Sequence, residues 1–86
     1  MIYSIRGLVQ ELTPTFAVIE AGGIGYYVSL SLQTSQNLKL NSEVFLFVQQ
    51  IIREDAHLLF GFFSKEEKEM FNLLISVNGV GPVSAL

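Results

Sequence analysis

The stretch Gly22-Gly-Ile-Gly-Tyr-Tyr-Val-Ser-Leu-Ser-Leu32 decides how the chain should fold. Its opening glycines are typical of a tight turn, and the residues after them alternate between two chemical types, which is the period-2 pattern of a half-buried strand. One predicted face carries Tyr26, Val28, Leu30 and Leu32, and the other carries Tyr27, Ser29 and Ser31. Because the apolar segment Phe16–Glu20 precedes the glycines, the whole region predicts a β-hairpin.

Turn signals on either side of this hairpin divide residues 1–63 into short strands. Thr13-Pro-Thr15 forms one boundary, and the polar segment 35–42 predicts a connector or a short helical turn. Arg53-Glu-Asp-Ala56 predicts the acidic tip of a second hairpin. The predicted strands are an opening segment before Thr13, Phe16–Glu20, Tyr26–Leu32, Glu43–Ile52 and His57–Phe63. This pattern predicts a mainly β fold, a five-stranded OB-fold barrel, with a sheet covered by one helix as the alternative.

Ser64 begins a different element. Ser64 and Glu67 have the spacing of a capping box, in which the hydroxyl accepts from the first turn and the carboxylate reaches back to the cap. We therefore predict an amphipathic helix over 64–77, with Lys65 and Lys68 among glutamates on its solvated face. Its apolar face is predicted from residues at helical spacing: Met70, Phe71, Leu74 and Ile75.

Composition limits the classes of protein that this chain can be. It has 86 residues, half of them hydrophobic, a net charge of −3 and no cysteine. No apolar stretch approaches the roughly 20 residues that cross a bilayer, and so much apolar surface on a small chain predicts self-association. The lack of cysteine and of signal-peptide features predicts a cytoplasmic protein. The negative charge argues against a strongly basic surface for nucleic acid.

The residues offer little for catalysis. His57 is the single histidine, and it lies among apolar residues of a predicted strand, outside any nucleophile motif. The glycines at 22–25 precede a strand and so lack the helix N-terminus of a phosphate-binding loop. The chain also lacks the grouped ligands of a zinc site. We therefore expect no catalytic residue, no metal and no cofactor.

Asn78-Gly-Val-Gly-Pro82 is a stronger candidate for a binding site, because it predicts a tight turn between two helices. Gly79 and Gly81 would expose successive backbone N–H groups, and Pro82 is favoured in the first turn of a helix. Such N–H groups suit a phosphate without reading bases. A helix cap followed by a proline-initiated helix would give the same pattern without any ligand. The acidic tip at 54–55 is equally open, because loops are commonly charged for solvation alone.

Together these blocks resemble the N-terminal part of the RuvA family, bacterial proteins that bind Holliday junctions and serve with the RuvB motor in branch migration. The resemblance is carried by Met1-Ile2 with Arg6-Gly7, Ile19–Tyr26 with Val28, Arg53–Ala56 with Leu58–Phe62, Glu66-Glu67, Phe71, Leu74-Ile75 and Asn78–Pro82. It implies an OB-fold barrel that builds a tetramer, a helical domain with two helix-hairpin-helix motifs, and a small domain that contacts RuvB. We expect the barrel domain at 1–63 and the start of the helical domain, with a truncated first helix-hairpin-helix, at 64–86.

The resemblance also implies which residues act. It assigns contacts with the DNA backbone to Asn78, Gly79, Val80 and Gly81, and an acidic pin to Glu54 and Asp55. Carboxylates from four subunits near the crossover would repel the converging phosphates and keep the junction open. Val83 departs from the pattern, because the family commonly has a lysine there.

The implied function is that of a non-catalytic, structure-specific DNA-binding subunit in recombination and repair, with ATP hydrolysis in RuvB. The expected partners are four-way junction DNA, other copies of the chain in a homotetramer or octamer, and RuvB through a C-terminal domain missing here; no membrane is expected. The alternative is an oligomerisation or scaffold domain that does not bind DNA, whose apolar barrel surface performs the whole function.

Overall fold

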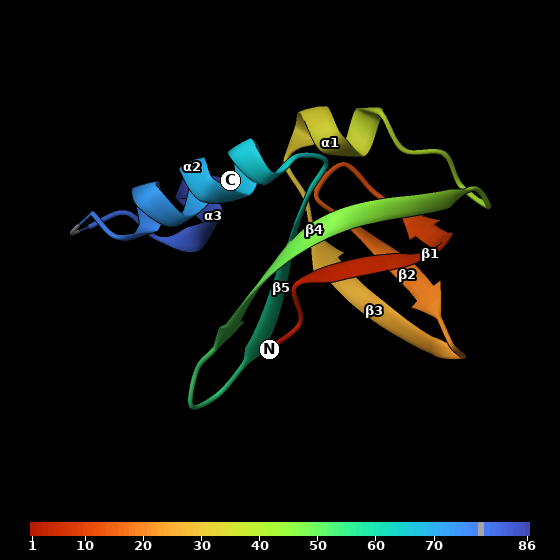
Figure 1. The fold of residues 1–86 in the computed structure, drawn as a ribbon, viewed down its shortest axis with the longest axis horizontal. Helices are drawn as coiled ribbons and strands as arrows, with labels where there is room; N and C mark the ends of the chain where they lie inside the picture. Colours follow the sequence, from red (N-terminus) through yellow and green to blue (C-terminus); the bar gives the residue numbers. More distant parts are fainter. Residues whose placement is uncertain (78) are drawn as a thin grey trace.

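The computed structural model describes residues 1–77 and 79–86. Its strands are β1 Ser4–Leu12, β2 Phe16–Ala21, β3 Ile24–Ser29, β4 Glu43–Ile52 and β5 His57–Phe62, and its helices are α1 Leu32–Gln36, α2 Lys65–Ile75 and α3 Pro82–Ala85. Figure 1 shows the strands curling into a barrel, with α1 at one end and α2 and α3 together on one side. No helix in the described ranges is long and apolar enough to cross a membrane.

The strands close into a barrel in the order β1-β2-β3-β5-β4. Neighbouring strands are antiparallel except β3 and β5, which are parallel and meet in the pair Ser29 and Phe60. The short helix α1 connects β3 to β4. This order, and a small helix at that crossover, confirm the predicted OB-fold barrel and exclude the open sheet covered by one helix.

The barrel interior is filled by apolar side chains, most of them from β1 to β4. The buried cluster consists of Ile5, Val9, Ala17, Ile19, Val28, Leu30, Leu38, Leu46 and Val48. Gly61 of β5 lies against this cluster, and a Cβ atom there would approach Val28 Cγ1 to 2.7 Å. Glycine is therefore required at this position because β5 crosses close to the filled interior. A second cluster, Phe60, Phe62 and Phe71, joins β5 to α2.

The first predicted hairpin is confirmed, but its second strand ends earlier than expected. β3 stops at Ser29, and the Ser31 hydroxyl accepts a hydrogen bond from Thr34 N at 3.2 Å, which makes Ser31 the N-cap of α1. Leu32 is consequently the first helical residue and is 57% exposed, so its predicted place on the inward strand face is wrong. The serine cap breaks the alternation because its side chain satisfies the backbone of the next turn.

The helix after Ser64 is confirmed, although its inner face is rotated from the predicted one. The Ser64 hydroxyl accepts from Glu67 N at 3.2 Å and donates to Glu67 Oε1 at the same distance. The helix ends at Ile75, before the predicted residue 77. Phe71 is buried as expected, whereas Met70 is 57% exposed and Leu74 is also exposed. The spacing of the apolar residues predicted the helical period correctly, but it placed the buried face of the helix too far toward Met70.

Candidate nucleic-acid interface

Glu54 and Asp55 lie at the tip of a two-stranded arm. The ladder between β1 and β4 ends at the pair Ser4 and Phe47, whereas β4 and β5 stay paired as far as Ile52 and His57. The tip is closed by hydrogen bonds between the backbones of residues 53 and 56, the shorter at 2.7 Å. Figure 1 shows this loop projecting beyond the barrel, so a large partner can reach it without any change in the barrel.

The two carboxylates at the tip are exposed and carry their charge outward. Neither forms an ion pair within 4.0 Å in the described part of the chain, where Arg6 and Glu43 form a marginal pair at 4.0 Å. Arg53 next to them is exposed as well. An unneutralised pair of carboxylates at the end of a narrow arm presents a local negative potential that repels phosphate.

The described residues between α2 and α3 agree with the predicted tight turn between two helices. Gly79 has a φ of 86°, in the left-handed region that favours glycine, and Val80 N donates to Val77 O at 3.2 Å. Gly81 is the N-cap of α3 and Pro82 is its first residue, as expected. Asn78, the first of the predicted contact residues, lies outside the described residues.

The structure explains why position 79 is a glycine, but it gives no such reason for position 81. A Cβ atom at either position would meet none of the described atoms within 4 Å. The positive φ of Gly79 accounts for that glycine, but Gly81 has an extended backbone at φ −86° and ψ 165°, which any residue adopts. Gly81 also provides no side-chain cap for α3, whereas serine or aspartate would. Neither backbone conformation nor internal packing therefore requires glycine at position 81.

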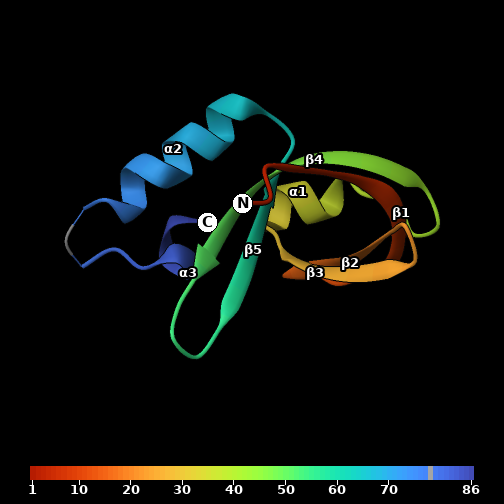
Figure 2. The same ribbon diagram turned by 60° about the horizontal axis from the view of Figure 1, so that its bottom comes forward.

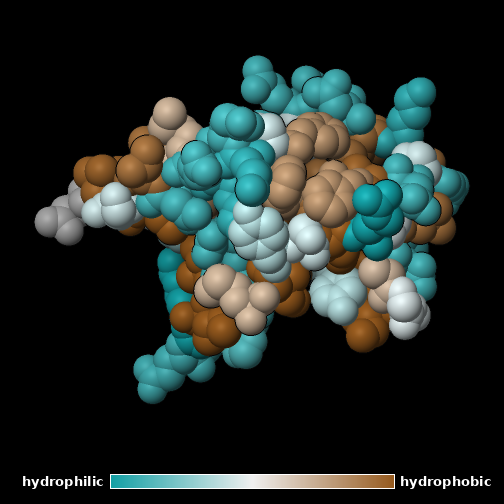
Figure 3. Space-filling view, viewed as in Figure 1, coloured by the Kyte–Doolittle hydropathy of each residue, from teal (hydrophilic) through white to brown (hydrophobic). Residues whose placement is uncertain are grey.

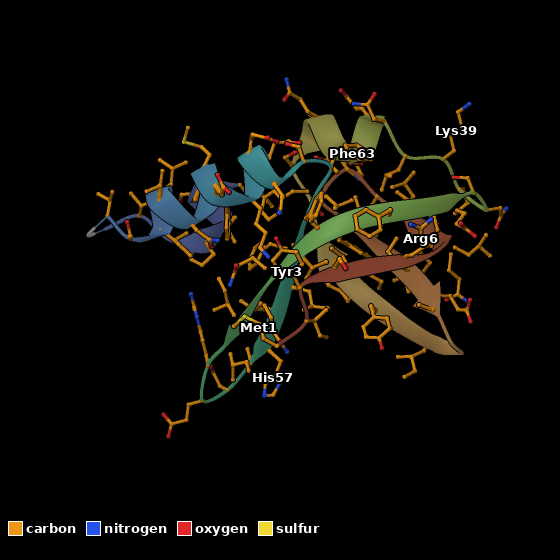
Figure 4. All side chains as sticks on the ribbon, viewed as in Figure 1. Met1, Tyr3, Arg6, Lys39, His57 and Phe63 are labelled. Atoms are coloured by element: carbon orange, nitrogen blue, oxygen red, sulfur yellow. The ribbon has the colours of Figure 1, made fainter. Side chains whose placement is uncertain are left out.

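Cationic side chains are sparse around this turn. Residues 69–86 contain no lysine or arginine, and Val83 is exposed where the resemblance leads us to expect a lysine. Arg6 and Lys39 lie at the end of the barrel away from α2 and α3 (Figure 4). Backbone N–H groups, not side-chain charges, are what the turn itself offers to an anion.

Lys68 is the largest departure from the sequence-based prediction, because it is buried at 8% exposure and not on a solvated face. Its Nζ lies 3.5 Å from the centroid of the Tyr3 ring, a cation–π contact. The pKa of the Lys68 ammonium lies below its ordinary value, first because burial removes water and second because the charge of Lys65 is close. Sequence reasoning could have found this position, since Lys68 precedes the buried Phe71 by three residues on one helix face.

The described residues contain no group of three or more His, Cys, Asp and Glu side chains that could hold a metal. His57 begins β5 at the exposed base of the tip loop. The features that the structure presents for binding are thus an acidic arm, a glycine turn with open space around it, and exposed apolar side chains.

A closed barrel in OB order, continued by a capped helix and a glycine turn, defines an OB-fold protein with a helical extension. The family described as RuvA N terminal domain matches residues 1–61. The chain belongs to the RuvA family, which confirms the resemblance read from its motifs.

Curated relatives agree over nearly the whole chain. The Holliday junction branch migration complex subunit RuvA of Parabacteroides distasonis is 49% identical over 85 residues, which is 99% of this chain and 43% of the relative. The protein of the same name from Porphyromonas gingivalis is 48% identical over 99% of this chain and 42% of its own length. That from Streptococcus pneumoniae is 44% identical over 95% of this chain and 42% of its own length. The chain thus spans less than half the length of these relatives.

Proposed function

We propose that this chain is the barrel and first hairpin of a non-catalytic subunit that binds four-way junction DNA and supports branch migration by a RuvB motor in bacterial recombination and repair. Membership of the RuvA family supports this proposal, as do relatives whose names refer to the Holliday junction and to branch migration. RuvB would supply ATP hydrolysis and would bind through parts of the protein outside this chain.

In this proposal the turn between α2 and α3 holds phosphates through the backbone of Gly79, Val80 and Gly81, together with Asn78. The observation that carries it is Gly81, where the chain has no packing or conformational need for glycine. A glycine there leaves room for close approach by another molecule and leaves the N–H groups of the first turn of α3 without a side-chain cap. Contacts of this kind position DNA without reading its sequence.

The acidic arm would repel phosphates, whereas the glycine turn would bind them. Glu54 and Asp55 would act as a pin near the crossover, where their charges repel the phosphates of strands that pack closely. Their exposure, their lack of an ion pair among the described residues and their position at the end of a projecting arm support this role. Affinity would then arise at the glycine turn, and strand separation would arise at the arm.

Assembly would bring several arms together. We propose a homotetramer, or an octamer of two tetramers, built on the barrel at residues 1–63, with residues 64–86 as the start of the helical domain. Large apolar side chains exposed on the barrel support association, among them Tyr27, Phe45 and Ile52. A homotetramer would place the carboxylates of four chains around one crossover.

The test is a competition between a synthetic four-way junction and excess linear duplex at low and moderate salt, with particle mass from light scattering. The proposal predicts a particle of about four chains that prefers the junction and keeps that preference as salt weakens binding. Equal binding to both DNAs would overturn shape recognition. Assembly without any DNA binding would favour the alternative, an oligomerisation domain whose apolar surface is its whole function.

A further inference from the structure

Helix α2 is attached to the barrel by a small set of contacts on one face. Phe71 packs on Phe60 and Phe62 with ring centroids 5.0 and 5.1 Å apart. Asn72 Nδ2 donates to Gln49 Oε1 at 3.0 Å. The ammonium of Lys68 lies over the ring of Tyr3, in the segment before β1. Figure 2 shows α2 crossing beside the barrel, with the turn to α3 at its far end.

These contacts differ in how far they restrict the position and the orientation of α2. Apolar packing of Phe71 is non-directional, so it holds α2 near β5 without defining its rotation. Lys68 and Asn72 are one helical turn apart on the same face, and their partners belong to two different segments, Tyr3 just before β1 and Gln49 within β4. Two directional contacts to two separate segments define both the rotation of α2 and its tilt.

The low exposure of the Lys68 side chain needs an explanation of its own. Lysine is almost never fully buried unless it is paired, and in the described part of the chain Lys68 has no carboxylate within ion-pair distance. Burial also disfavours its charged form. Methionine would fill a similar volume without desolvating a charge, so simple packing does not account for a lysine here. The contact with the electron-rich face of the Tyr3 ring does, because it requires a cation.

We propose that Lys68 is a positioning residue, which sets the orientation of α2 through the Tyr3 ring and thereby places the Gly79–Gly81 turn relative to the barrel and its acidic arm. The consequence for DNA rests on the proposed function, since it assumes that the turn and the arm contact one junction. The positioning itself rests only on the contacts of Lys68 with the barrel.

Because the chain has no cysteine, the geometry can be measured directly with two spin labels. The label sites are Glu11→Cys in β1 and Leu73→Cys on the outer side of α2, both exposed. Double electron–electron resonance on labelled chains diluted with unlabelled chains would give the distribution of distances between barrel and helix within one chain. We expect Lys68→Met to broaden or shift this distribution and Lys68→Arg, which keeps a cation over the ring, to retain it.

Lys65→Met is the matched control, because it removes the same charge from an exposed position on the same helix. Tyr3→Leu should reproduce the effect of Lys68→Met, and Tyr3→Phe should not. An unchanged distance distribution in both Lys68→Met and Tyr3→Leu would overturn the proposal. If Lys68→Met fails to fold by circular dichroism, Tyr3→Leu decides the matter, since Tyr3 lies at the surface.

Junction binding provides the second readout. Lys68→Met should weaken it by roughly threefold to tenfold, the range expected when a cation–π contact that orients the binding turn is lost, and Lys68→Arg should stay within about twofold. Weakening in Lys65→Met equal to that in Lys68→Met would contradict positioning and indicate a general charge effect. If the unaltered chain binds no junction, the proposed function fails, while the distance measurement still decides the role of Lys68.

Discussion

The barrel and the helical segment are held together in different ways. In the barrel, β1 to β4 all contribute to one buried cluster, and several of its side chains have no solvent exposure at all. In α2 only Lys68 and Phe71 are buried, and in α3 no residue is buried. Figure 3 shows apolar side chains gathered at the surface of the helical end. The barrel therefore maintains its own shape, whereas the position of the glycine turn depends on a few contacts.

The same difference applies to the two proposed activities, strand separation by the acidic arm and phosphate binding by the glycine turn. The acidic arm is a direct continuation of β4 and β5, so the pairing of these strands sets its orientation. The glycine turn follows a helix that touches the barrel along one side. Changes in the barrel should consequently damage the whole molecule, and changes in the helical segment should act locally.

The largest effect is expected for Leu46→Ala, which removes a fully buried side chain from the barrel cluster. We expect the free energy of unfolding to fall by about 2 to 5 kcal/mol, because the lost transfer energy is joined by the cost of a cavity. Leu73→Ala, at a leucine that is 64% exposed on α2, should change it by less than about 0.5 kcal/mol. Urea unfolding measures both, and equal losses would contradict the contrast between barrel and helix.

An intermediate effect is expected within the turn itself. Gly79→Ala forces a Cβ atom into the left-handed region, at a cost of about 1 to 2 kcal/mol. The amides of Val80 and Ala85, which donate to Val77 O and Gly81 O, should then exchange roughly 5 to 30 times faster. Hydrogen exchange followed by NMR measures this local loss, while amides of the barrel strands should not change.

Gly81→Ser is the matched partner of that variant. Serine fits the extended backbone, meets open space and caps α3, so exchange at Ala85 should stay the same or slow. Junction binding should nevertheless weaken, because the new side chain occupies the space and the N–H group that we assign to a phosphate. Unaltered junction affinity in Gly81→Ser would remove the main support for the turn as a contact site.

The smallest effect on folding is expected at the acidic tip. Glu54→Gln with Asp55→Asn should alter the free energy of unfolding by less than about 0.5 kcal/mol, because both side chains are exposed and neither is in an ion pair among the described residues. Glu11→Gln is the control for loss of an exposed carboxylate elsewhere on the barrel. A larger loss, seen in thermal or urea unfolding, would mean that the carboxylates help to fold the arm.

Much of the fold could be predicted because local signals and tertiary structure agree. The glycines at 22 and 23 have positive φ values, the bounds of β4 are those predicted, and Ser64 caps its helix as expected. Prediction failed at Leu32, where a serine cap outweighed strand alternation. Local patterns do not show how far a strand continues when a polar side chain can satisfy the backbone of a new helix.

The motifs of the candidate site could be predicted from the sequence, but their placement relative to one another in the folded chain could not. The acidic tip and the two glycines are visible in the sequence, and the structure adds that only Gly79 needs glycine for its backbone. Lys68 was assigned to a solvated face because charged residues surround it, and no local pattern reveals that the Tyr3 ring lies above it. A contact between residues 65 positions apart depends on the closed barrel, which only the folded chain provides.

The most direct test of the account is strand separation at the crossover of a bound junction, read by the fluorescence of 2-aminopurine placed there. We predict that the variant Glu54→Gln with Asp55→Asn binds the junction as tightly as the unaltered chain, or more tightly, but gives a smaller rise in fluorescence because fewer bases unstack. Weaker binding by this variant, or the same rise in fluorescence, would contradict the assignment of affinity to the glycine turn and of separation to the acidic arm.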